Sequence, residues 1–264
     1  MNTDKFVPAG KFLFDQYRTN SEMRALPEQL SPASIEEAYL IQIEYLNMLS
    51  QQYGSPAGHK LAYTTQTMQE RAGLTEPCAG QILQDTIYKS PAVLHSADYV
   101  KLGIECEIAV ILGSDISPNS IPHTIKSISD SIECIMPAFE IVDFRTPDLQ
   151  GIQRALTAIS TNISNAGIVL GEATYQWHDI DLRTVRGEMF INGESVGYGK
   201  GSDIMGHPFE PLVWLANKFS AEELTIPTGS IIITGSIVTP KYLLEGDNAT
   251  ITITDLGEAH LSVD

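Results

Sequence analysis

Two glutamates lie one residue apart in an otherwise apolar run from Gly103 to Leu112, and this pattern strongly constrains the fold. The run is short and rich in β-branched residues, and a Gly-Ser-Asp turn signal follows it, which is typical of a buried strand. Side chains alternate along a strand, so Glu105 and Glu107 share one face with Ala109. Two carboxylates on one buried face repel each other and lose hydration.

A second strand-like segment, Pro137 to Asp143, carries a third glutamate, Glu140. A Glu-x-Glu pair alone is common on solvated strands. However, the flanks of the first strand are too apolar for a freely wet face. Mg²⁺ and Mn²⁺ prefer carboxylate oxygens and keep positions open for water or substrate. Three carboxylates from two neighbouring strands therefore predict a divalent metal site at Glu105, Glu107 and Glu140.

Composition limits the class of protein. The chain has 264 residues, 43% of them hydrophobic, which is enough for one domain with a substantial core. A formal net charge of -17 argues against binding to nucleic acid or to an anionic membrane. The N-terminus lacks a signal-peptide pattern and no apolar run is long enough to span a bilayer, so we expect a cytoplasmic protein. The cysteines Cys78, Cys106 and Cys134 have no CxxC spacing and are expected to be reduced core residues.

The N-terminal part of the chain carries helix signals. Ser31 and Pro32 are predicted to be the N-cap and the first residue of a helix that ends near Gln52. We expect another helix before Ser31 to pack against it. Further helices are predicted over residues 65–72, 125–135 and 208–219.

From about residue 100 onward, strand patterns dominate. Asn192-Gly193 between two alternating segments predicts a type I′ β-hairpin. Helices followed mainly by strands indicate an α+β fold in a single domain over 1–264, with a helical portion of about 1–75 and a curled mixed sheet over about 76–264. Strands are predicted over residues 58–64, 104–112, 138–143, 167–170, 183–191, 194–199, 230–234, 249–254 and 260–263.

Six short segments in a fixed order carry a family resemblance. They are Gly58–Thr64, Gly80–Asp85, Glu105–Glu107, Pro137–Glu140, Gly199–Asn217 and Gly229–Ser236. Together they resemble the 2-keto-4-pentenoate hydratase / 4-oxalocrotonate decarboxylase family, within the fumarylacetoacetate hydrolase superfamily. The resemblance extends from about Leu26 to the C-terminus.

The resemblance implies a distorted mixed β-roll with an N-terminal helical portion. It also implies a homo-oligomer, or an assembly with a partner enzyme of the same fold. Members of the family act on short unsaturated 2-keto acids from aromatic ring cleavage. By resemblance, Mg²⁺ or Mn²⁺ held by Glu105, Glu107 and Glu140 chelates the carboxylate and the 2-oxo oxygen of such a substrate.

The resemblance also implies roles for Lys60 and Asp85, and Arg145, by its position soon after Glu140, and Ser164 are two further candidates. Lys60 is expected to bind the substrate carboxylate or to transfer a proton, and a partly buried lysine beside a metal is expected to have a lowered pKa. Asp85 is the second acid–base candidate. Arg145 and Ser164 are candidates for substrate binding, although an arginine near acidic residues more often pairs with them. Judged by position alone, Lys60 resembles a surface lysine and Asp85 a turn residue.

The leading functional prediction is a hydratase that adds water to a 2-hydroxy-2,4-dienoate and gives a 4-hydroxy-2-oxo acid. A metal at the 2-oxo oxygen acts as a Lewis acid and stabilises the enolate that this reaction requires. The alternative activities are a 4-oxalocrotonate-type decarboxylase and an acylpyruvate hydrolase. The decarboxylase acts on a dicarboxylate, and such a substrate requires an extra cation in the pocket. A non-catalytic assembly subunit is the remaining alternative, because residues 160–167, around Asn162, lack the acidic residue usual in the family.

Overall fold

The computed structural model describes residues 3–118, 122–147 and 149–264. Its helices are α1 Phe6–Tyr17, α2 Ile35–Tyr53, α3 Gln66–Ala72, α4 Ile125–Ser129, α5 Gly151–Ser160 and α6 Glu210–Ala221. Its strands are β1 Pro56–Ala62, β2 Cys78–Leu83, β3 Ile87–Lys89, β4 Ala92–Leu94, β5 Leu102–Leu112, β6 Ile132–Asp143, β7 Asn165–Leu170, β8 Arg186–Ile191, β9 Glu194–Lys200, β10 Ile231–Ile233, β11 Val238–Tyr242, β12 Asn248–Ile253 and β13 Gly257–Val263.

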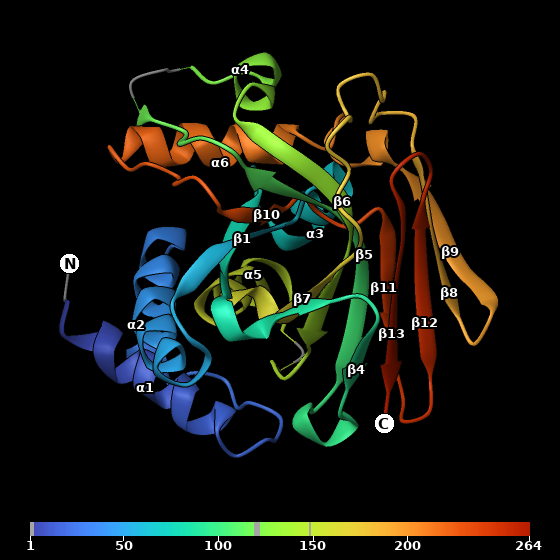
Figure 1. The fold of residues 1–264 in the computed structure, drawn as a ribbon. Coiled ribbons are helices and arrows are strands. Elements are labelled where there is room, and N and C mark those ends of the chain that lie inside the picture. The colour runs from blue at the N-terminus through green and yellow to red at the C-terminus, as the bar shows by residue number, and fades with distance from the viewer. Residues whose placement is uncertain (1–2, 119–121, 148) are drawn as a thin grey trace.

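Two mixed β-sheets form the body of the molecule (Figure 1). Within the described residues, eight strands form the larger sheet in the order β2-β1-β10-β5-β6-β7-β3, with β11 paired to β5. The smaller sheet has the order β4-β13-β12-β8-β9. Helices α1 and α2 pack together beside the larger sheet, as expected for the N-terminal part (Figure 1). This arrangement confirms the predicted α+β class, and none of the described helices is long and apolar enough to cross a membrane.

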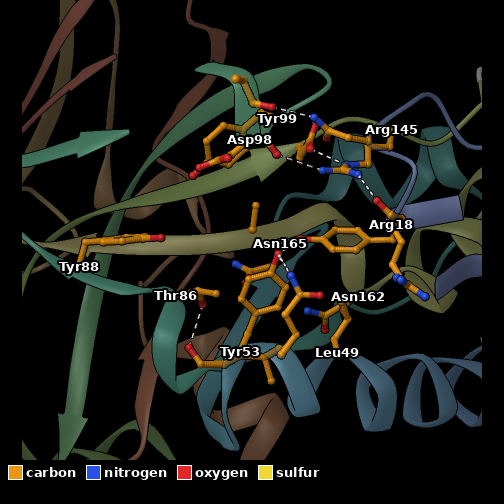
Figure 2. Close-up of a pocket in the computed structure, with 17 residues that line it drawn as sticks. Arg18, Leu49, Tyr53, Thr86, Tyr88, Asp98, Tyr99, Arg145, Asn162 and Asn165 are labelled. Carbon is orange, nitrogen blue, oxygen red and sulfur yellow. Dashed lines mark hydrogen bonds and ion pairs between the residues drawn. The ribbon is translucent and has the colours of Figure 1, made fainter. Parts of the chain in front are cut away.

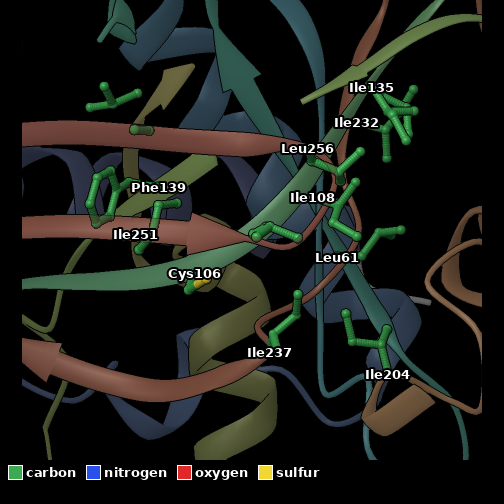
Figure 3. Packing of buried hydrophobic residues seen from close by; sticks show 14 of the residues in the cluster. Leu61, Cys106, Ile108, Ile135, Phe139, Ile204, Ile232, Ile237, Ile251 and Leu256 are labelled. Atoms are coloured by element: carbon green, nitrogen blue, oxygen red, sulfur yellow. The ribbon is translucent and has the colours of Figure 1, made fainter. Parts of the chain in front are cut away.

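The antiparallel pair β5 and β6 lies at the centre of the larger sheet. One face of this pair carries apolar side chains that pack against the smaller sheet, and Figure 3 shows Phe139 next to Ile251. Cys106 and Ile108 belong to the same core. Because side chains alternate along a strand, the opposite face of β5 carries the two glutamates, as the sequence predicted.

Helix α2 begins three residues later than predicted. Its N-cap is Ser34, whose hydroxyl accepts a hydrogen bond from the backbone N–H of Glu37 at 3.3 Å. The Glu37 carboxylate also pairs with Lys5 at 2.7 Å. Ser31 instead bonds the Leu26 carbonyl through its hydroxyl. The prediction at Ser31 was wrong because the next serine forms the cap: Ser34 and Glu37 have the spacing of an N-cap and its N3 residue, and the Glu37 carboxylate also accepts from the backbone N–H of Ala33 at 2.7 Å.

The predicted helix over 125–135 was also wrong in its second half. Helix α4 ends at Ser129, and β6 begins at Ile132. Ile135 and Cys134 lie in that strand, opposite Val110 and Ile111 of β5. A fully buried strand is apolar on both faces. The isoleucines of β6 therefore fell by chance at the three- and four-residue spacing that is typical of a helix.

Replacing Phe139 with alanine is expected to lower the free energy of unfolding by about 3–5 kcal/mol, because a fully buried ring leaves a cavity between the sheets. Guanidinium denaturation followed by circular dichroism measures the change. Val93→Ala is the control, since Val93 is 57% exposed and should change stability little. A loss below about 1 kcal/mol for Phe139→Ala would contradict the packing described here.

Candidate metal centre

Three glutamates converge on the face of the larger sheet that is opposite the intersheet core. Glu105 lies directly across from Glu140 in the β5–β6 register, and Glu107 lies opposite Ala138. One carboxylate oxygen from each glutamate lies within 4.8 Å of the other two. Glu107 and Glu140 are 0% exposed, whereas Glu105 is partly exposed. The structure therefore brings together the three predicted metal ligands.

The two oxygens of each buried carboxylate have different environments. Glu107 Oε2 accepts a hydrogen bond from the backbone N–H of Gly235 at 2.7 Å. Glu140 Oε1 accepts one from Asn165 Nδ2 at 2.9 Å and pairs with Lys60 Nζ at 3.1 Å. Among the described residues, Glu107 Oε1 and Glu140 Oε2 are buried without a partner. Buried oxygens left unpaired in this way fit the donor set of Mg²⁺ or Mn²⁺.

The cluster has an unfavourable charge balance. Burial and the charge of Glu140 raise the pKa of Glu105 to about 7, and the pKa of Glu107 lies well above its ordinary value for the same reasons. Burial alone lowers the pKa of Lys60, but the three carboxylates outweigh it, so the net shift of this pKa is upward. This upward shift belongs to the three carboxylates without a cation, so the lowered pKa expected for Lys60 beside a bound metal stays a prediction.

Two glycines make room for the donors of this site. Gly80 of β2 lies opposite Lys60 of β1, and a Cβ atom at position 80 would lie 3.1 Å from Lys60 Cγ and 2.7 Å from Asn162 Oδ1. Gly235 has a φ of +110°, and a Cβ there would lie 2.2 Å from the Thr64 hydroxyl. Both positions require glycine for the same reason, which is a close approach to neighbouring atoms.

The other predicted site residues lie around the cluster rather than in it. Asp85 is exposed on the 3₁₀ turn Gln84–Thr86 and, among the described residues, forms no hydrogen bond or ion pair with the glutamates. Ser164 has a left-handed backbone, with a φ of 60°. The acid–base role of Asp85 and the substrate-binding role of Ser164 stay predictions.

Arg145 is buried in a network of its own. Its Nε pairs with Asp143 Oδ2 at 2.5 Å, Nη1 donates to the Tyr17 carbonyl at 2.7 Å and Nη2 to the Asp98 carbonyl at 3.3 Å. The pairing with an acidic neighbour that the sequence favoured is thus present. With these contacts in place, the predicted role of Arg145 in substrate binding remains untested.

A pocket of about 530 Å³ lies beside the metal centre (Figure 2). Asn165 connects the two, because it lines the pocket and donates its hydrogen bond to Glu140. Figure 2 shows Arg18 and Arg145 on one side of the pocket and Tyr88 on the opposite side. Among the described residues, the Arg18 side chain forms no hydrogen bond or ion pair. The remaining lining is mostly polar and aromatic: Tyr17, Asn20, Leu49, Gln52, Tyr53, Leu83, Thr86, Ala97, Asp98, Tyr99, Asp143, Asn162 and Ala166.

Comparison with known proteins identifies the family. Residues 59–264 match the family model described as fumarylacetoacetate (FAA) hydrolase C-terminal. The chain belongs to the fumarylacetoacetate hydrolase family. This family region includes the three glutamates, Lys60 and Asn165.

Individual relatives cover most of the chain at modest identity. A 2-oxo-hept-4-ene-1,7-dioate hydratase from Escherichia coli is 26% identical over 245 residues, 91% of each chain. A 4-oxalocrotonate decarboxylase from Pseudomonas putida is 27% identical, over 84% of this chain and 82% of that protein. The structure of a 4-oxalocrotonate decarboxylase from Pseudomonas putida G7, complexed with magnesium and adipate, matches with a TM-score of 0.90 and 21% identity. That match covers 100% of this chain and 99% of the other, and it supports the fold of this family member.

Sequence reasoning missed two donors of the centre, Gly235 and Asn165. The segment Gly229–Ser236 was noticed as part of the resemblance, but no role for the Gly235 N–H followed from it. Asn165 lies in the segment noticed for its lack of an acidic residue, and an asparagine in a loop gives no signal of its own.

In this family member, Glu107→Gln is expected to weaken Mn²⁺ binding by at least ~100-fold, because a neutral amide replaces a buried anionic ligand. Isothermal titration calorimetry measures the affinity. In EDTA the variant should melt at the same or a higher temperature than the wild type, since the substitution removes a charge that burial disfavours. Glu133→Gln, at an exposed position on β6, is the matched control. Equal Mn²⁺ affinity in both variants would exclude Glu107 as a ligand.

Proposed function

We propose that this chain is a metal-dependent hydratase that converts a 2-hydroxy-2,4-dienoate into a 4-hydroxy-2-oxo acid. The observation that carries the proposal is the pair of buried, unpartnered oxygens on Glu107 and Glu140, next to the ammonium group of Lys60. A structural role does not require three carboxylates gathered in this way. The similarity to a hydratase over 91% of the chain supports the same class of reaction.

The residues of the site suit a small anionic keto acid. When bound, a divalent cation at the three glutamates supplies Lewis acidity for the 2-oxo oxygen of the substrate. Lys60 pairs with Glu140 at 3.1 Å and the neighbouring carboxylates raise its pKa, so in this proposal its ammonium group attracts the substrate carboxylate and donates a proton. We assign Asp85 the second acid–base role and Ser164 a contact with the substrate. In this proposal a 2-hydroxydienoate takes a proton at carbon 5, and water then adds at carbon 4.

Product identification by NMR tests the hydratase proposal. Purified protein with 2-hydroxypenta-2,4-dienoate and Mg²⁺ is expected to form 4-hydroxy-2-oxopentanoate, and EDTA should stop the reaction. Loss of dienol absorbance is an insufficient readout, because the dienol also ketonises unaided. A ketonised substrate without the hydrated product would count against the hydratase.

A second candidate is an enzyme that acts on a diacid, such as a 4-oxalocrotonate-type decarboxylase. A second carboxylate requires an additional cation in the pocket, and Arg18 offers one without an acidic partner among the described residues. Arg145 is less suited, because its guanidinium group is already engaged. The similarity to a decarboxylase over 84% of the chain supports this candidate as well.

Replacing Arg18 with glutamine separates the two candidates. If the substrate is a diacid, kcat/KM for oxalocrotonate should fall by roughly 10-fold or more, since a charge-assisted contact contributes about 1.5–3 kcal/mol. Turnover of the monoacid 2-hydroxypenta-2,4-dienoate should stay unchanged. Lys11→Gln, at an exposed position on α1, the helix that ends just before Arg18, is the control. Equal kinetics of wild type and Arg18→Gln on both substrates would remove the diacid candidate's structural support.

A further inference from the structure

Glu140 is held by one of its two oxygens. Both donors that reach this carboxylate, Lys60 Nζ at 3.1 Å and Asn165 Nδ2 at 2.9 Å, bind Oε1. Oε2 is buried and unpartnered among the described residues. The terminal torsion of a glutamate is broad, so the carboxylate plane can rotate unless contacts fix it. Two donors on one oxygen fix that plane and leave the other oxygen, Oε2, available.

An amide suits this position better than a charged donor. A second cation beside Lys60 would repel a divalent ion, whereas the neutral amide of Asn165 orients Glu140 without adding charge. The amide also has a clear orientation, because only its nitrogen has hydrogens to donate to a carboxylate. Asn165 therefore supports one oxygen of Glu140 while leaving the electrostatic attraction for a metal ion intact.

An unusual backbone turn places Asn165 at this point. The three preceding residues, Asn162, Ile163 and Ser164, have φ angles of 57°, 47° and 60°. A left-handed conformation is unfavourable for the β-branched Ile163. The Asn162 side chain anchors the turn, since it accepts from Gln81 N at 2.7 Å and donates to Gln81 O at 2.8 Å. The strained turn precedes β7, and the hydrogen bonds of Asn162 attach it to β2, the strand that pairs with the Lys60 strand β1.

We propose that Asn165 is a positioning residue of the metal centre, one that holds Glu140 so that Oε2 faces the ion. The inference rests on the proposed function, because it requires the three glutamates to bind a metal. Asn165 also lines the 530 Å³ pocket, so its amide lies between the metal ligand and the space next to it. Outer contacts of this type typically change metal affinity 10–100-fold when they are removed.

Mn²⁺ titration calorimetry on Asn165→Ala and Asn165→Leu tests the inference. Each variant should bind Mn²⁺ about 10–100-fold more weakly than the wild type, because Glu140 loses the donor that orients it. Leucine has the same branched arrangement of side-chain heavy atoms without a donor and alanine removes the branch, so the two variants together separate the hydrogen bond from packing. Asn47→Ala, on the exposed side of α2, is the matched control and should keep the wild-type affinity.

Two outcomes overturn the inference in distinguishable ways. If the folded variants bind Mn²⁺ with wild-type affinity, Asn165 does not position Glu140, but the three glutamates can still be the metal ligands. A wild-type protein that binds no Mn²⁺ would remove the metal centre and the inference together. Circular dichroism in EDTA establishes that each variant is folded.

A measurement on the wild-type protein does not depend on how the variants fold. In ¹⁵N-asparagine-labelled protein, Mg²⁺ should shift the side-chain amide signal of Asn165 and leave that of Asn47 unchanged. An unshifted Asn165 signal at saturating Mg²⁺ would overturn the inference.

Discussion

The structure depends on a concentration of negative charge on one buried face of the β5–β6 pair. Three carboxylates there lie with Lys60, and burial works against the charged forms of Glu105, Glu107 and Lys60. Such a cluster is costly unless each group has a partner. The protein supplies partners for one oxygen each of Glu107 and Glu140, through Gly235 and Asn165, and the remaining oxygens are the donors that could hold a hard cation.

The two faces of the larger sheet have separate tasks. One face forms the intersheet core with the smaller sheet, which gives the central strands a rigid support. The other face presents the glutamates and Lys60. A ligand set on two adjacent, tightly packed strands is held more precisely than one on loops, which is what a metal site of defined geometry requires.

The N-terminal helices complete the site without contributing a metal ligand. The family match begins at residue 59, yet Tyr17, Arg18 and Tyr53 line the pocket next to the centre. Arg145 ties this part to the sheet, because it bonds Asp143 at the end of β6 and the Tyr17 carbonyl at the end of α1. The region that matches the family model thus holds the three glutamates, and the N-terminal portion contributes Tyr17, Arg18 and Tyr53 to the adjoining pocket.

Local patterns determined much of this protein. Strand alternation placed Glu105 and Glu107 on one face and Cys106 on the other, and Asn192-Gly193 marked a turn whose φ angles of 53° and 83° fit the prediction. Only the tertiary structure decided the rest. It extended β6 back to Ile132 and brought Asn165 to Glu140. The reason is physical: alternation and turn preferences act between neighbours in the chain, whereas these features depend on contacts between segments that are distant in sequence and meet only in the folded protein.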